Sequence, residues 1–89
     1  MREFTVEEKS CCDEEGRQHT FRYSIVVDEV LAGNFTCEDF GVKVEETGGE
    51  CSIIRGITPS QTRIKGLIAL LTEHLVTPVN LPDVIQDWL

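Results

Sequence analysis

The sequence is short of basic residues. Its 89 residues include 8 Lys or Arg against 16 Asp or Glu, which gives a formal net charge of -8. Because nucleic-acid binding draws most of its affinity from basic side chains that neutralise phosphates, this balance argues against DNA or RNA as a partner. It also disfavours binding to anionic membranes. The remaining interpretations of the charge are solubility, a basic protein partner, or an acidic decoy that imitates nucleic acid.

Long apolar runs are also missing. No run reaches the roughly 18 residues that a membrane-spanning helix needs, so we expect no transmembrane segment and no membrane partner. The first eight residues, MREFTVEE, are charged and alternate like a strand, which argues against a secretory signal peptide. A chain of this length has room for one core, so we expect residues 1–89 to form a single domain. These features predict a cytoplasmic protein.

The sequence contains none of the short motifs that mark common enzymes. It has no glycine-rich phosphate loop, no Gly-x-Ser-x-Gly elbow and no His-Glu-x-x-His helix. The two histidines are His19 and His74, and no nucleophile or orienting carboxylate stands at a recognisable spacing from either. His74 lies near the end of a predicted helix, where a basic side chain is favoured by the helix dipole. We therefore expect no catalytic residues and no enzyme.

Four cysteines are present, but their spacing is not that of a metal or redox site. Cys11, Cys12, Cys37 and Cys51 include no Cys-x-x-Cys pair. Neighbouring residues on a strand point to opposite faces, so Cys11 and Cys12 are poorly placed to bind one metal. We expect no metal and no cofactor, and four thiols that stay reduced in the cytoplasm. A thiol-based metal or redox protein remains an alternative function.

Alternating apolar and polar residues predict four strands. The clearest pattern covers residues 20–27, where Phe21, Tyr23, Ile25 and Val27 point to one face and the residues between them to the other. A first strand is predicted over residues 2–12, a third from Phe40 to Val44 and a short fourth over residues 51–54. Turn residues at 13–16, 32–34 and 47–50 separate them. This pattern predicts an antiparallel meander with one core face and one wet face.

The remainder of the chain predicts two helices. Thr58 is the expected cap, Pro59 the first helical residue and Gln61 the partner in a capping box. The helix should end near Val76, because Thr77-Pro78 cannot continue it. Its apolar stripe is Ile64, Leu67, Ile68, Leu71 and Leu75. Gly66 is expected to let this helix lie close to the sheet.

A second, short helix should begin at Asn80 or Leu81. The predicted fold class is therefore α+β, with a four-stranded antiparallel meander, one face covered by a C-terminal helix, and a short terminal helix.

Two segments are candidates for contact with a partner. The connection from Asp28 to Asp39 contains Val30, Leu31 and Phe35, more apolar surface than a hairpin loop needs. The favoured expectation is that these residues fold back over the open end of the core, and the alternative is a partner-binding tip. For the terminal segment, residues 81–89, we expect Trp88 to be buried in the core, and the alternative is an exposed hot spot for a partner.

Three stretches of sequence resemble a known family. Residues 21–25 (FRYSI), 40–44 (FGVKV) and above all 75–89 (LVTPVNLPDVIQDWL) resemble short uncharacterised proteins of clostridia-like Gram-positive bacteria, catalogued as a domain of unknown function. The resemblance covers nearly the whole chain, although the 28–39 connection and the cysteines lie outside its pattern. It implies one small intracellular domain and brings no activity, cofactor or site.

Together, these observations predict a small non-enzymatic protein that binds another protein. The surfaces available for this contact are a sheet edge, the apolar connection and the C-terminal segment. A meander leaves two unpaired edges, so the protein is expected to be a monomer or a homodimer formed through one edge. An acidic decoy would instead need carboxylates in a continuous stripe, which Lys9, Arg22 and Lys43 are expected to interrupt.

Overall fold

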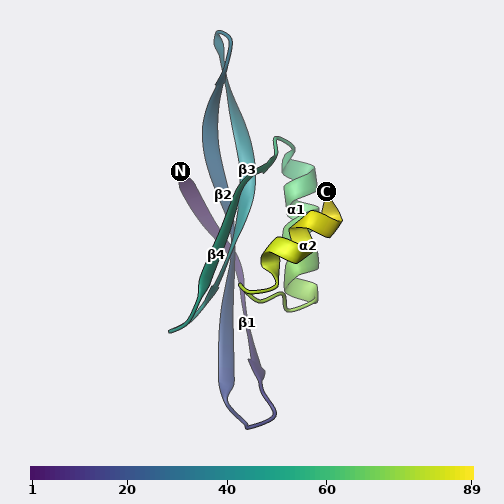
Figure 1. Cartoon of the computed structure of the whole chain (residues 1–89). Helices are drawn as coiled ribbons and strands as arrows, with labels where there is room; N and C mark the ends of the chain where they lie inside the picture. The colour runs from purple at the N-terminus through teal and green to yellow at the C-terminus, as the bar shows by residue number, and fades with distance from the viewer.

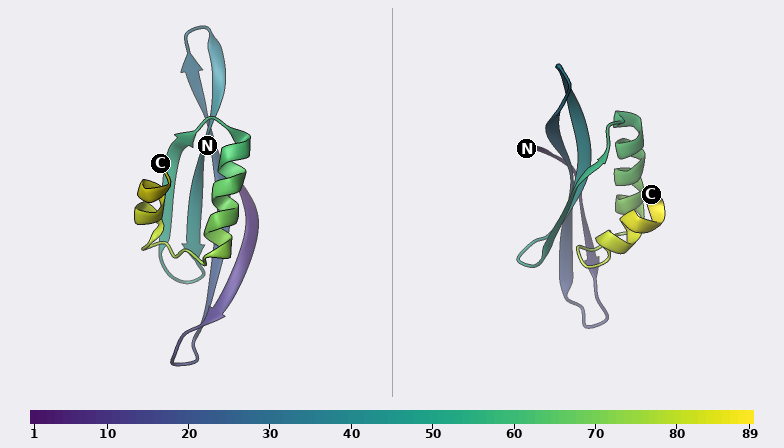
Figure 2. Two further views of the ribbon diagram at one scale, coloured as in Figure 1. Left: turned by 90° about the vertical axis from the view of Figure 1, so that its right-hand side faces the viewer. Right: turned by 45° about the horizontal axis from the view of Figure 1, so that its top comes forward.

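The computed structural model describes residues 1–89 as one antiparallel sheet with two helices (Figure 1). Strands β1 (Arg2–Cys12), β2 (Gln18–Ala32), β3 (Phe35–Glu46) and β4 (Cys51–Thr58) lie side by side in chain order. Helices α1 (Gln61–Glu73) and α2 (Leu81–Trp88) both lie against the same face of this sheet (Figure 2). The predicted α+β meander is therefore confirmed. Neither helix is long and apolar enough to span a membrane.

The core lies between the helices and the inner face of the sheet. The inward residues of β2 and β3 are cross-strand partners, as in Tyr23 with Val44 and Ile25 with Val42. From α1, the predicted apolar stripe is buried at Ile64, Leu67, Ile68 and Leu71. Burial of this apolar area supplies most of the favourable free energy of folding.

One buried hydrogen bond joins the sheet to the connection between the helices. The hydroxyl of Tyr23 donates to the backbone carbonyl of Val76 at 2.9 Å, and the Tyr23 side chain is completely buried. Burial raises the pKa of Tyr23 to about 12, since the charged phenolate has no water to solvate it there. Tyr23 therefore fixes the point at which the chain leaves α1.

The start and end of α1 differ from the predicted ones. Ser60 is the cap, because its hydroxyl accepts a hydrogen bond from the backbone N–H of Arg63, whereas Thr58 is the last, buried residue of β4. The helix ends at Glu73 rather than near Val76. Leu75 has a φ of 50°, and the N–H of Val76 bonds to the carbonyl of Leu71, which closes the helix in a Schellman motif.

Two glycines, Gly66 of α1 and Gly56 of β4, have roles that the sequence does not predict. Gly66 lies on the exposed side of α1, and a methyl group added there would meet nothing within 4 Å, so the expectation that it allows close packing is wrong. Gly56 has a φ of 65°, which a β-bulge accommodates. This bulge lets β4 continue past the predicted end at Ile54 to Thr58, where it pairs with Phe40.

The outer face of the sheet is less open than the alternation predicts. Ser24 and Val26 point away from the helices, yet both are buried. Long side chains across neighbouring strands, including that of Lys43, lie over this central part of β2. The Ser24 hydroxyl has no hydrogen-bond partner.

The terminal segment packs largely as expected. Leu81 and Ile85 of α2 are buried in the core, as the prediction for residues 81–89 requires. Trp88 is only partly buried and packs at the edge of the core, and Leu89 is exposed. The expectation of a fully buried indole is therefore wrong in degree, because α2 ends where the core ends.

The molecule is long and narrow. Its principal extents are 55 × 24 × 18 Å and its radius of gyration is 14.1 Å, against about 12 Å for a compact domain of this length. The excess comes from two hairpins that project from opposite ends of the body, β1–β2 and β2–β3 (Figures 1 and 2).

Candidate functional site

The projecting β2–β3 hairpin holds three of the four residues predicted to contact a partner. Residues 28–32 and 35–39, expected to be a loop, continue β2 and β3 in register, with Val30 opposite Cys37 and Ala32 opposite Phe35. A two-residue turn, Gly33-Asn34, joins them, and Gly33 has the positive φ of 66° that the first position of a type II′ turn requires. The hairpin is thus an extended two-stranded ribbon.

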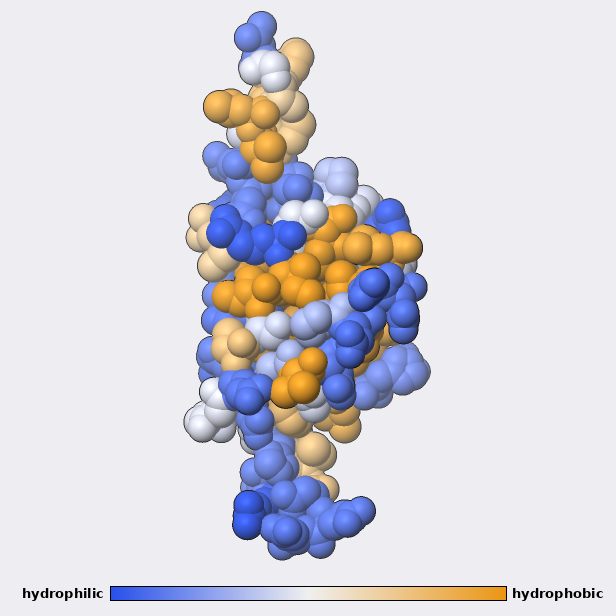
Figure 3. Space-filling view, viewed as in Figure 1, coloured by the Kyte–Doolittle hydropathy of each residue, from blue (hydrophilic) through white to orange (hydrophobic).

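The apolar residues of this hairpin are exposed. The exposed fractions are 45% for Val30, 79% for Leu31 and 76% for Phe35. The favoured expectation, that they fold back over the core, is wrong, because strand pairing carries them away from the body. In the space-filling view, apolar residues at this end are separated from the apolar surface of the body by hydrophilic ones (Figure 3).

The opposite end of the molecule provides a comparison within the same chain. The β1–β2 hairpin also projects, but its turn, residues 13–17, contains no apolar side chain (DEEGR). The carboxylate of Asp13 accepts hydrogen bonds from the backbone N–H groups of Glu15 and Arg17, which stabilises the turn. The turn at the tip of a projecting hairpin in this protein can therefore be wholly polar, so the apolar tip of β2–β3 is not a requirement of the fold.

Carboxylates surround the base of the β2–β3 hairpin. Asp28 lies opposite Asp39, and Glu29 lies opposite Glu38, two like-charged cross-strand pairs of the kind that destabilises a sheet. The body supplies one arginine to each pair. Arg55 bonds to Asp28 at 2.6 and 2.9 Å and holds the pKa of that carboxyl below its usual value, and Arg2 pairs with Glu38.

Two of these four carboxylates therefore stay without a cationic partner. Neither Glu29 nor Asp39 forms an ion pair. The hairpin thus combines an apolar tip with an acidic base.

The fourth predicted contact residue lies elsewhere. Trp88 is on α2, against the body, while the hairpin tip is at the far end of the molecule (Figure 1). The guanidinium of Arg63 stacks over its ring at 4.6 Å from the centroid. The structure therefore does not bring Trp88 together with Val30, Leu31 and Phe35.

Sequence reasoning missed a cluster around His19. The Nδ1 atom lies 2.6 Å from a carboxylate oxygen of Glu46, and Nε2 lies 3.0 Å from one of Asp13. The hydrogen bond to Asp13, followed by that to Glu46, raises the pKa of His19. These carboxylates stand at no recognisable sequence spacing from His19, because the β1–β2 turn brings Asp13 to the ring and the pairing of β2 with β3 brings Glu46.

Cys11 is the cross-strand neighbour of His19 and lines the same hollow of about 370 Å³. A catalytic Cys–His pair needs a ring nitrogen that faces the thiol. Here both ring nitrogens contact carboxylates, so the geometry is that of ion pairs that join the β1–β2 turn to β3.

The cysteines are dispersed over the molecule. Cys11 is half-buried and Cys12, Cys37 and Cys51 are exposed, all as free thiols. No group of three or more His, Cys, Asp and Glu side chains is placed to hold a metal ion.

The outer face of the sheet carries charges of both signs. Arg22 lies between Glu8, at 3.0 Å, and Glu45, at 3.6 Å. Lys43 lies between Glu3, at 3.1 Å, and Glu45, at 3.5 Å. The carboxylates of this face therefore form a ladder interrupted by Arg22 and Lys43 rather than a continuous acidic stripe. The expectation that Lys9 also interrupts this face is wrong, because Lys9 lies opposite the inward residue Phe21.

Comparison with known proteins gives a family and no function. No curated protein and no solved structure matches the chain. The profile of a family described as a family of unknown function (DUF6514) matches residues 2–89. This match covers nearly the whole chain, so the protein belongs to this family of unknown function.

Proposed function

We propose that the protein is a small non-enzymatic module that binds another protein through the tip of its β2–β3 hairpin. The observation that carries the proposal is the exposure of Leu31 and Phe35, each more than three-quarters accessible, on a ribbon held clear of the body. Large exposed apolar side chains on a rigid projection are typical of contact sites, and leaving them in water costs solubility. The polar β1–β2 hairpin of the same chain supports a specific role for the apolar one.

The acidic base of the hairpin indicates the chemistry of the partner. A matching surface would offer an apolar socket for Leu31 and Phe35, bordered by Lys or Arg side chains that face Glu29 and Asp39. Such complementarity steers encounter and selects against acidic partners. The cost of two like-charged cross-strand pairs is then offset in the complex.

The location and assembly state belong to the same proposal. We place the protein in the cytoplasm, where four free thiols stay reduced. We favour a monomer, because the outer strand β1 is bulged between Thr5 and Glu7 and carries acidic side chains, both of which oppose edge-to-edge pairing. The interrupted charge ladder makes a nucleic-acid decoy the weaker alternative.

Affinity capture with matched variants tests the contact site. Tagged wild-type protein, a Leu31→Ser/Phe35→Ser variant and a Val79→Ser/Leu89→Ser control would be incubated with extract of the native cell. The control removes two similarly exposed apolar residues from the C-terminal part of the chain, outside the hairpin. A true partner should be retained by the wild type and the control and be depleted roughly tenfold or more by the tip variant. Equal recovery with both variants would contradict the proposal.

A further inference from the structure

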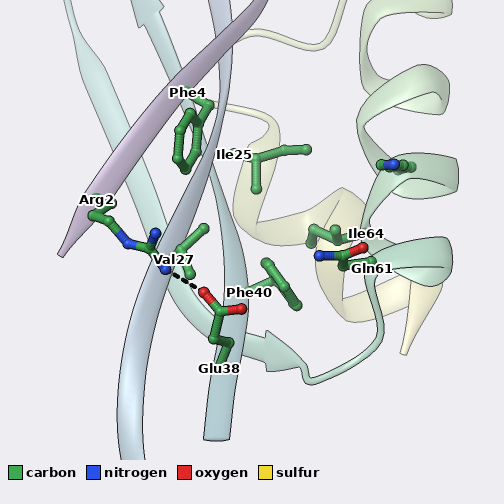
Figure 4. Close-up of a pocket in the computed structure, with 9 residues that line it drawn as sticks. Arg2, Phe4, Ile25, Val27, Glu38, Phe40, Gln61 and Ile64 are labelled. Atoms are coloured by element: carbon green, nitrogen blue, oxygen red, sulfur yellow. Dashed lines mark hydrogen bonds and ion pairs between the residues drawn. The ribbon is translucent and has the colours of Figure 1, made fainter.

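A cavity between α1 and the sheet is lined mainly by apolar side chains (Figure 4). Its volume is about 390 Å³, near the lower end of the range of small-molecule sites. Apolar walls are contributed by Phe4 of β1, Ile25 and Val27 of β2, Phe40 of β3 and Ile64 of α1. Phe4 is 52% exposed, so a large aromatic ring stands half in water at this cavity.

One basic residue that lines this cavity forms no ion pair, unlike most basic residues of the chain. Six of the eight basic residues form ion pairs with carboxylates: Arg2, Lys9, Arg17, Arg22, Lys43 and Arg55. The remaining two, Arg63 and Lys65, both lie near the beginning of α1. Arg63 stacks on Trp88, whereas Lys65 lines the cavity. Lys65 is thus the one Lys or Arg side chain with neither a carboxylate nor an aromatic partner.

The beginning of α1 offers Lys65 no partner of opposite charge. The first turn of α1 contains no acidic residue, although the chain has 16. A negative charge is favoured at this end of a helix. Arg2, the other cation of the cavity, is already neutralised by Glu38 (Figure 4). The cavity therefore has an apolar interior and one uncompensated positive charge.

We propose that this cavity binds a small amphipathic carboxylate, with its apolar body between Phe4 and Ile64 and its single negative charge at Lys65. A chain of eight carbon atoms fits within this volume. The hairpin tip takes no part in this site, so the inference is independent of the proposed protein contact.

Octanoate is the probe for this site. Amide shifts of ¹⁵N-labelled full-length protein would be followed while octanoate is added into the millimolar range at neutral pH. Saturable shifts should cluster at the residues that line the cavity. Acetate, which has the charge without the apolar body, and octylammonium, which has the opposite charge, should produce neither saturation nor this pattern.

Two variants on the same helix separate the roles of the cations. Lys65→Gln should weaken octanoate binding roughly two- to fivefold, the scale of an exposed ion pair. Arg63→Gln is the matched control and should leave it unchanged, because Arg63 faces Trp88. Phe4→Ala, on an exposed edge position, should also weaken binding while the protein stays folded. Failure of octanoate to saturate, equal binding of octylammonium, or equal effects of the two helix variants would overturn the proposal.

Discussion

Two glycines in opposite surroundings show how far single positions control this fold. Gly66 lies on the exposed side of α1, where an added Cβ would meet nothing within 4 Å. At Gly41 of β3, an added Cβ would lie 2.2 Å from the carbonyl oxygen of Ile54 and 2.8 Å from the Cα of Arg55. Gly41 therefore allows β4 to approach β3 closely, while Gly66 has no packing role.

Substitution of these glycines by alanine should change stability in opposite directions. Gly66→Ala should raise the free energy of unfolding by up to about 1 kcal/mol, since alanine is the better helix former. Gly41→Ala should lower it by about 1–3 kcal/mol through overpacking against backbone atoms. Urea unfolding followed by circular dichroism measures both. A stability loss in Gly66→Ala would show that this face of α1 contacts something.

The buried Tyr23 hydroxyl predicts a specific dependence on alkaline pH. Folding raises the tyrosine pKa from about 10 to about 12, so the folded state binds more protons than the unfolded state between these values. Stability due to this group is complete below pH 10 and should fall by about 2 kcal/mol as pH rises towards 12. Tyr23→Phe should cost about 1–3 kcal/mol at neutral pH, because the Val76 carbonyl loses its donor.

Comparison of the wild type with Tyr23→Phe separates the contribution of the Tyr23 hydroxyl from that of other groups that titrate in the same pH range. The wild type should lose more stability than Tyr23→Phe between pH 10 and 12. Parallel stability curves for the two proteins would mean that the hydroxyl is not buried against Val76.

Among the elements, the β2–β3 hairpin is separable from the core. Its outer residues contribute no member to the buried apolar cluster. Removal of residues 31–32 and 35–36 would place the Gly33-Asn34 turn directly between Val30 and Cys37, which are already cross-strand partners and have the same hydrogen-bonding type as the present closing pair. The shortened protein should keep its fold, with a melting temperature within a few degrees of the wild type, measured by circular dichroism. A large fall would show that the hairpin stabilises the body.

The terminal helix α2 should show the opposite behaviour, with its stability contribution concentrated at one residue. Ile85 is buried, whereas Trp88 is partly exposed beneath Arg63. Ile85→Ala should therefore cost about 2–5 kcal/mol, and Trp88→Ala about 1 kcal/mol. Denaturant unfolding of both variants gives the order. A larger loss for Trp88→Ala would place the indole deeper in the core than its exposure indicates.

At the scale of the whole molecule, the sequence predicted the core well and the projections poorly. The alternation around Tyr23 and Val42 and the stripe from Ile64 to Leu71 show which faces meet, because an element that buries one face repeats its apolar residues at its own structural period. The sequence predicts a loop for the hairpin because Gly33-Asn34 is a short turn signal and an exposed two-stranded ribbon has no regular apolar alternation.

The candidate sites depend on contacts and exposures that sequence spacing alone does not predict. The His19 cluster requires the cross-strand register of Asp13 and the distant Glu46. The unpaired charge of Lys65 can be identified only when the partners of the other Lys and Arg side chains are known from the structure. The sequence shows that Val30, Leu31 and Phe35 are an excess of apolar surface, but their exposure follows from the length of the paired strands.

Photo-crosslinking in the native cell tests the central claim, that the hairpin tip contacts a protein partner. A benzophenone amino acid would replace Phe35 in one strain and Val79, an exposed apolar residue away from the tip, in another. We predict a discrete covalent adduct from position 35 on irradiation, and none from position 79. Absence of an adduct at position 35, or the same adduct from both positions, would contradict the claim.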